Sequence, residues 1–163
     1  MFYTFVYFVK MEKRIVIKIL SLIFRFLLGG LLVFAGVLKV IDNTTLFEAV
    51  AYITWIPVGL KSLVIDFLPW IEIVAGSLLI LHLFDKLVIP VNGLIYLSFF
   101  LFTIWGLSSG IEMDCGCFGE LDKGSFLGSL LGSEISWQMM IRNAIFTLMA
   151  GFVYWHSQIY NRS

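Results

Sequence analysis

Charged side chains are scarce in this chain of 163 residues: they make up 13% of it, whereas hydrophobic residues make up 60%. A soluble domain carries about a quarter of its residues as charged side chains, so we expect lipid to cover most of the surface. The chain also has no surplus of positive charge, because 11 Lys and Arg residues balance 11 Asp and Glu residues. Without such a surplus, nucleic acid is not an expected partner.

Long apolar runs dominate what is present. A bilayer core needs roughly twenty apolar residues in a helix, and four stretches reach that length. They cover residues 19–40, 63–84, 87–107 and 137–156. The sequence therefore predicts an all-α fold, a polytopic membrane protein with a bundle of four transmembrane helices.

The connections between these stretches complete the predicted organisation. Between spans 1 and 2, Thr45 and Glu48 have capping-box spacing, which predicts a short interfacial helix. Asp85 and Lys86 mark a very short turn between spans 2 and 3. We expect one membrane domain over residues 19–157, a cytoplasmic segment before it (1–18) and a cytoplasmic tail after it (158–163), with Met1 and Met11 as alternative starts.

A basic cluster before the first span predicts the orientation. Its members are Lys10, Lys13, Arg14 and Lys18. A signal peptide would have the same basic start, but this apolar run is too long and no small-x-small cleavage site follows it. By the positive-inside rule both termini are cytoplasmic and the segment between spans 3 and 4 is extracytoplasmic. On the assumption of a bacterial source, the protein lies in the inner membrane.

Charged residues within the spans mark the candidate site, because ionisable groups are costly inside a bilayer. Glu72 and Arg142 are predicted at matching depth, roughly 8 Å below the outer interface. Lys39 and Asp42 close the first span at the same face. We expect Glu72 to pair with Arg142, or failing that with Lys39; a purely structural ion pair is the alternative. Arg25 is predicted to be a snorkelling side chain at the inner face.

Other polar and aromatic residues have ordinary interpretations. Asn92 and Asn143 are expected to hydrogen-bond between helices, and the two histidines, His82 and His156, to be interfacial or packed near the inner face. Aromatic residues near the outer face are predicted to form a belt at the interface rather than a quinone pocket. They are Trp55, Trp70, Phe118 and Trp137.

The only two cysteines, Cys115 and Cys117, lie in the stretch "MDCGCFGE". A metal site within one chain is not expected, because zinc needs four ligands and both histidines are predicted far from the thiols. A metal shared with another protein stays an alternative. A structural disulfide across one residue would close too short a loop to stabilise much. A redox pair fits better: Gly116 permits the tight closure, and strained, exposed disulfides are labile. Asp114 argues the other way, since a nearby negative charge raises a thiol pKa.

Four motifs in order resemble one known family. "FAGVLKVID", "LPWIEIVAG", "CGCFG" and "IRNAIF" are similar to motifs of the MauE (methylamine utilisation) family of DoxX-like membrane proteins. The resemblance implies a four-helix membrane domain that works beside a thioredoxin-like partner in forming or maintaining disulfides, including those needed for amine dehydrogenase maturation. Carried over by motif, it points to these residues: Lys39, Asp42, Glu72, Cys115, Cys117, Arg142 and Asn143.

Two functions from different classes follow. In the first, the Cys115 and Cys117 pair exchanges electrons with an extracytoplasmic thioredoxin-like protein, and a quinone or another protein is the second redox partner. Gly116 and Gly119 would let that partner approach, and Phe118 would anchor the loop at the membrane surface. In the second, the protein is a non-catalytic subunit or assembly factor of a larger membrane complex, and "CGCFG" is a structural turn.

Overall fold

The computed structural model describes residues 2–110 and 135–160, and in this part of the chain the protein is all-α. Its helices are α1 (Phe2–Ile41), α2 (Thr44–Tyr52), α3 (Val58–Ile80), α4 (Asp85–Ser108) and α6 (Trp137–Tyr160). Helix α1 is continuous from Phe2, with no break at residue 18 between the predicted N-terminal segment and the first span.

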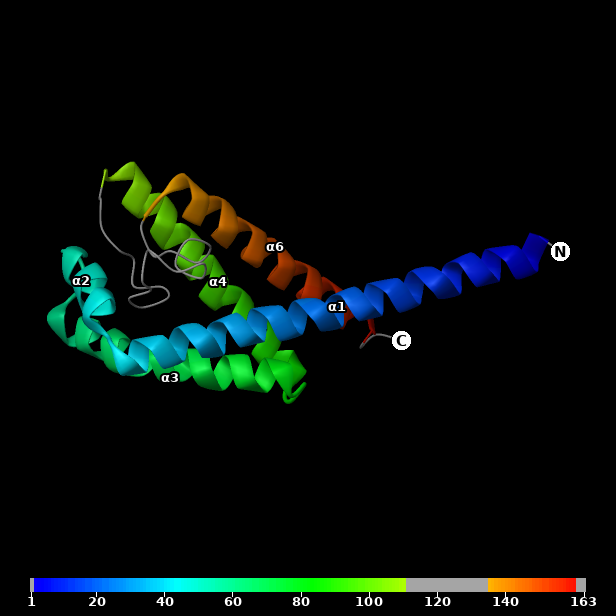
Figure 1. Ribbon diagram of the computed structural model, residues 1–163, viewed down its shortest axis with the longest axis horizontal. Coiled ribbons are helices and arrows are strands. Elements are labelled where there is room, and N and C mark those ends of the chain that lie inside the picture. The colour runs from blue at the N-terminus through cyan, green and yellow to red at the C-terminus, as the bar shows by residue number, and fades with distance from the viewer. Residues whose placement is uncertain (1, 111–134, 161–163) are drawn as a thin grey trace.

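Each of the four long helices runs antiparallel to the long helix before it (Figure 1). The most extensive contacts join α1 to α3, and the next join α4 to α6. One end of the bundle, where α1 and α4 end and α6 begins, is called the Lys39 end below. The opposite end, where α3 ends and α4 begins, is called the Arg25 end. The N-terminal turns of α1 extend beyond the bundle at the Arg25 end (Figure 1).

Three described helices are long and apolar enough to cross a membrane: Ile15–Ile41, Val58–Ile80 and Asp85–Ser108. The protein is therefore a multi-pass membrane protein. Helix α6 has similar length but is less apolar, and its crossing of the bilayer stays a prediction. Large hydrophobic side chains exposed on the bundle, such as Leu148 at 73% and Leu87 at 68%, are what a surface in contact with lipid requires.

The second predicted span was placed too far along the chain. Residues 63–84 were expected, but α3 occupies Val58–Ile80, and a tight turn over residues 81–84 leads into α4. His82 and Phe84 in this turn have positive φ values of 55° and 54°. Apolar residues continue through the turn, so composition alone could not reveal the end of the helix.

A short helix follows the first span, as predicted, and its position at a membrane interface stays a prediction. The predicted capping box is wrong. Helix α2 begins at Thr44, and Asp42 accepts hydrogen bonds from the Thr44 backbone N–H (2.9 Å) and hydroxyl (2.5 Å). Thr45 is instead buried in the bundle.

Glycines allow the backbones of α1 and α3 to touch. A Cβ atom on Gly76 would lie 2.6 Å from the Gly29 carbonyl oxygen, and one on Gly36 would lie 2.7 Å from the Pro69 carbonyl oxygen. Contacts this short do not occur for real Cβ atoms, so any larger residue would force the helices apart. Small residues at such contacts are typical of helix pairs in membranes, where close packing drives association.

We predict that Gly76→Ala destabilises the bundle by about 1–3 kcal/mol, the usual effect of overpacking, despite the better helix propensity of alanine. Gly93→Ala is the matched control, because a Cβ on Gly93 would meet nothing within 4 Å. We expect that control to be neutral or stabilising by up to about 1 kcal/mol. Thermal unfolding in detergent measures both variants, and equal unfolding temperatures would contradict the role assigned to Gly76.

Candidate functional site

A buried ion pair joins α1 to α3. Lys39 Nζ lies 2.5 Å from Glu72 Oε1, and the two side chains are 1% and 0% exposed. The ammonium group also lies 4.9 Å from the centroid of the Phe99 ring on α4, within the range of a cation–π interaction. Because a lone charge would be very costly at such a site, each residue of the pair depends on the other.

A second polar contact joins α4 to α6. Asn143 Nδ2 donates a 2.9 Å hydrogen bond to Thr103 Oγ1, and the Thr103 hydroxyl donates to the Phe99 carbonyl oxygen at 2.8 Å. Both side chains are buried. The prediction that Asn143 hydrogen-bonds between helices is confirmed.

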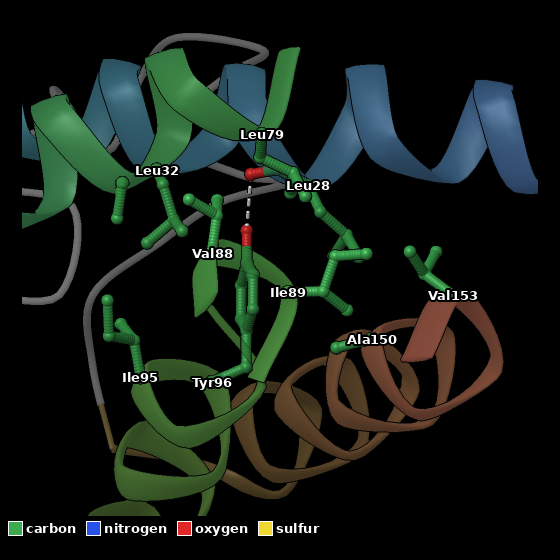
Figure 2. Close-up of a cluster of buried hydrophobic side chains, with 10 residues drawn as sticks. Leu28, Leu32, Leu79, Val88, Ile89, Ile95, Tyr96, Ala150 and Val153 are labelled. Carbon is green, nitrogen blue, oxygen red and sulfur yellow. Dashed lines mark hydrogen bonds between the residues drawn. The ribbon is translucent and has the colours of Figure 1, made fainter. Parts of the chain in front are cut away.

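One face of α4 carries the contacts that connect the bundle. Asn92, Tyr96, Phe99 and Thr103 follow one another at spacings of four, three and four residues, so they share that face. Tyr96 Oη donates to the Leu28 carbonyl oxygen of α1 at 2.6 Å (Figure 2). Asn92 Nδ2 donates to the Ala75 carbonyl oxygen of α3 at 3.2 Å, which confirms the interhelical role predicted for Asn92.

The expected pairing of Glu72 with Arg142 is not what the structure shows; Lys39, the alternative, is the partner. Arg142 lies partly buried on α6, beside Asn143. Asp42 also lies apart from the pair. Its hydrogen bonds with Thr44 lower the pKa of its carboxyl below the ordinary value, so Asp42 acts at the start of α2.

The predicted redox residues lie outside the described part of the chain. They are Cys115, Gly116, Cys117, Phe118 and Gly119. The ends of the segment that carries them are described, however, and both lie at the Lys39 end. A Cβ on Gly106 would lie 2.7 Å from Ile135 Cδ1, so the chain leaves α4 and approaches α6 at nearly the same place. Segment 111–134 thus starts and finishes at the end of the bundle where the last turn of α1 carries Lys39.

Arg25 is not the snorkelling side chain that the sequence predicted. Its side chain is 8% exposed, and its Nη1 donates to both carboxylate oxygens of Asp85 at 2.9 Å. The same atom lies 2.5 Å from Nδ1 of His82. The long side chain reaches the first turn of α4, because Asp85 supplies an anionic partner there.

The sequence of this helical bundle is similar to one known protein family. The chain matches the family model described as "Methylamine utilisation protein MauE" over residues 17–156. The chain belongs to the MauE family. A comparison with curated proteins found no significant match, and a comparison with solved structures found none either. The MauE match includes every helix of the bundle and the segment that carries both cysteines.

The sequence analysis did not identify three residues that make contacts between helices inside this MauE protein: Tyr96, Phe99 and Thr103. A signal was present, because with Asn92 they recur at helical spacing within one apolar stretch. Aromatic and hydroxyl side chains are common in membrane helices, however, so the pattern alone did not separate an interior face from a lipid-facing one.

We predict that Lys39→Met and Glu72→Gln each destabilise the protein by about 3–5 kcal/mol, because each leaves a buried charge without its partner. The double variant Lys39→Met/Glu72→Met should be clearly more stable than either single variant, since no charge remains buried. Unfolding in detergent of the wild type and the three variants measures these differences. Additive losses in the double variant would show that the two side chains do not depend on each other.

Proposed function

We propose that this MauE protein is the membrane component of an extracytoplasmic thiol–disulfide redox or protein-maturation system. Its Cys115 and Cys117 pair exchanges electrons with a thioredoxin-like partner. The observation that carries the proposal is the fully buried Lys39 and Glu72 pair. Its Lys39 belongs to the last turn of α1, at the end of the bundle where segment 111–134 begins and ends. Perturbed ionisable groups gather preferentially at functional sites.

Electrons and protons balance in this exchange, because one dithiol is oxidised to a disulfide as the other disulfide is reduced to a dithiol. The partner's disulfide accepts two electrons and two protons as Cys115 and Cys117 close to a disulfide, and the reverse step reduces the pair again. Attack requires a thiolate, so a proton must leave the attacking thiol. Because the chain has only two cysteines, its second redox partner must be another molecule, and a quinone in the bilayer is the candidate.

The charged residues near this end have supporting roles in the proposal. Arg142, on the second turn of α6, is a positive charge that offsets the acidic Asp114 and favours a thiolate. Glu72 is an acceptor that can hold a proton at its second carboxylate oxygen, with Lys39 stabilising its charge. Asn143 keeps α6 in register with α4 through Thr103.

The proposed setting is the bacterial inner membrane. All four long helices cross the bilayer, both termini are cytoplasmic, and the Lys39 end is extracytoplasmic, where the compartment favours disulfides. There the short helix α2 lies at the membrane interface. In this setting the protein works beside its thioredoxin-like partner, within a larger membrane complex.

We predict that Cys117→Ser traps a mixed disulfide between Cys115 and the partner, because the thiol that would resolve it is absent. Purification from native membranes without reductant, followed by electrophoresis with and without dithiothreitol, would detect the adduct. The control is Cys115→Ser/Cys117→Ser, which should give none. If the wild-type pair stays in one redox state between excess dithiothreitol and mild oxidant, the protein is instead a non-catalytic assembly factor.

We also predict that an impermeant maleimide labels Cys115 or Cys117 in reduced, intact spheroplasts, because the basic residues that precede the first span retain the N-terminus in the cytoplasm. Ser163→Cys in a background without other cysteines is the matched control for the opposite side. It should react only after lysis. Labelling of the native cysteines only after lysis would show that the orientation is inverted.

A further inference from the structure

Three buried oxygen atoms have no hydrogen-bond partner within residues 2–110 and 135–160. One belongs to the Thr45 hydroxyl, and the other two, Glu72 Oε2 and Asn92 Oδ1, can only accept. Glu72 and Asn92 are 0% and 1% exposed. A buried acceptor without a donor costs about 1–3 kcal/mol, and more when it is charged, so in a stable bundle these two atoms call for a donor beyond the described residues.

These two acceptors lie in the same part of the interior. Asn92 donates to the carbonyl oxygen of Ala75, one turn from Glu72 on α3. Tyr96 lies one turn from Asn92 on α4, and its hydroxyl donates to the Leu28 carbonyl oxygen of α1. The carboxylate, the amide and the phenol thus lie on neighbouring turns of α3 and α4. Internal water in proteins is bound by two to four such polar groups.

Apolar side chains enclose these acceptors on both sides. Toward the Arg25 end lie Val88, Ile89 and Val153, all at most 4% exposed (Figure 2). Toward the Lys39 end, Ala35 and Met139 form a second buried apolar cluster. Water bound to the two acceptors would therefore be internal water.

We propose that the bundle holds internal water that donates hydrogen bonds to Glu72 Oε2 and Asn92 Oδ1. Water there satisfies both acceptors beside the Lys39 and Glu72 pair. The site does not depend on redox activity of Cys115 and Cys117. It would be present in a non-catalytic assembly factor as well.

Radiolytic hydroxyl-radical footprinting of the full chain in lipid nanodiscs tests the proposal, because radicals formed from bound water modify adjacent side chains even when these are buried. After normalisation for intrinsic reactivity, we expect Tyr96, which is 2% exposed, to be oxidised several-fold faster than Val153. Val153 is the matched control, since it is 1% exposed and lies on α6, which carries neither acceptor. Equal rates at the two sites would overturn the proposal.

Two variants separate bound water from loosened packing. Asn92→Leu removes one acceptor and Lys39→Met/Glu72→Met removes the other, so oxidation of Tyr96 should fall in each variant toward the level of Val153. Unfolding temperature confirms that each variant is folded, and either one suffices if the other is not. Oxidation of Tyr96 that persists at the wild-type rate in a folded variant would also overturn the proposal, because the modified residue would then be responding to general access of solvent.

Discussion

Direct contact between the backbones of α1 and α3 is the constraint on which the candidate site depends. Gly29 and Gly76 meet where no Cβ atom could fit, and the two helices therefore lie close enough for Lys39 to reach Glu72. Neither charge could remain at this depth alone. The glycines thus do more than pack the bundle, since they make a buried ion pair possible in a protein with few charges.

Helix α4 then ties this pair of helices to the rest of the bundle. In lipid there is no hydrophobic force to bring helices together, so close packing and interhelical hydrogen bonds must do so. The interior face of α4 provides such hydrogen bonds at successive turns of the helix. Asn92 reaches α3, Tyr96 reaches α1, and Thr103 meets Asn143 of α6. The same residues carry polar atoms into the interior, which gives the bundle a polar core next to the ion pair.

The two ends of the bundle use their charges differently. At the Arg25 end, the guanidinium is satisfied by Asp85 and His82 at a tight turn, which fixes α1 against the α3–α4 hairpin. At the Lys39 end, the pair leaves one carboxylate oxygen without a donor among the described residues. The first arrangement pairs a cation with an anion at a turn and is structural. The second leaves a buried acceptor open next to Lys39, the residue in the last turn of α1, and chemistry is therefore proposed at that end of the bundle.

The sequence by itself determined the class of the protein, because scarcity of charge and long apolar runs leave a helical membrane bundle as the stable solution. Its four motifs also indicated the MauE family. Because depth along a helix follows from residue number, the sequence limited the expected partners of Glu72 to Arg142 and Lys39. It also predicted interhelical hydrogen bonds for Asn92 and Asn143. Only the tertiary structure decided that Lys39 is the partner, that Arg25 is buried against Asp85, and that α3 ends at Ile80. Those outcomes depend on how far each helix is rotated and how closely it approaches its neighbour. In a chain that is apolar on nearly every face, hydrophobic periodicity does not reveal the rotation of a helix.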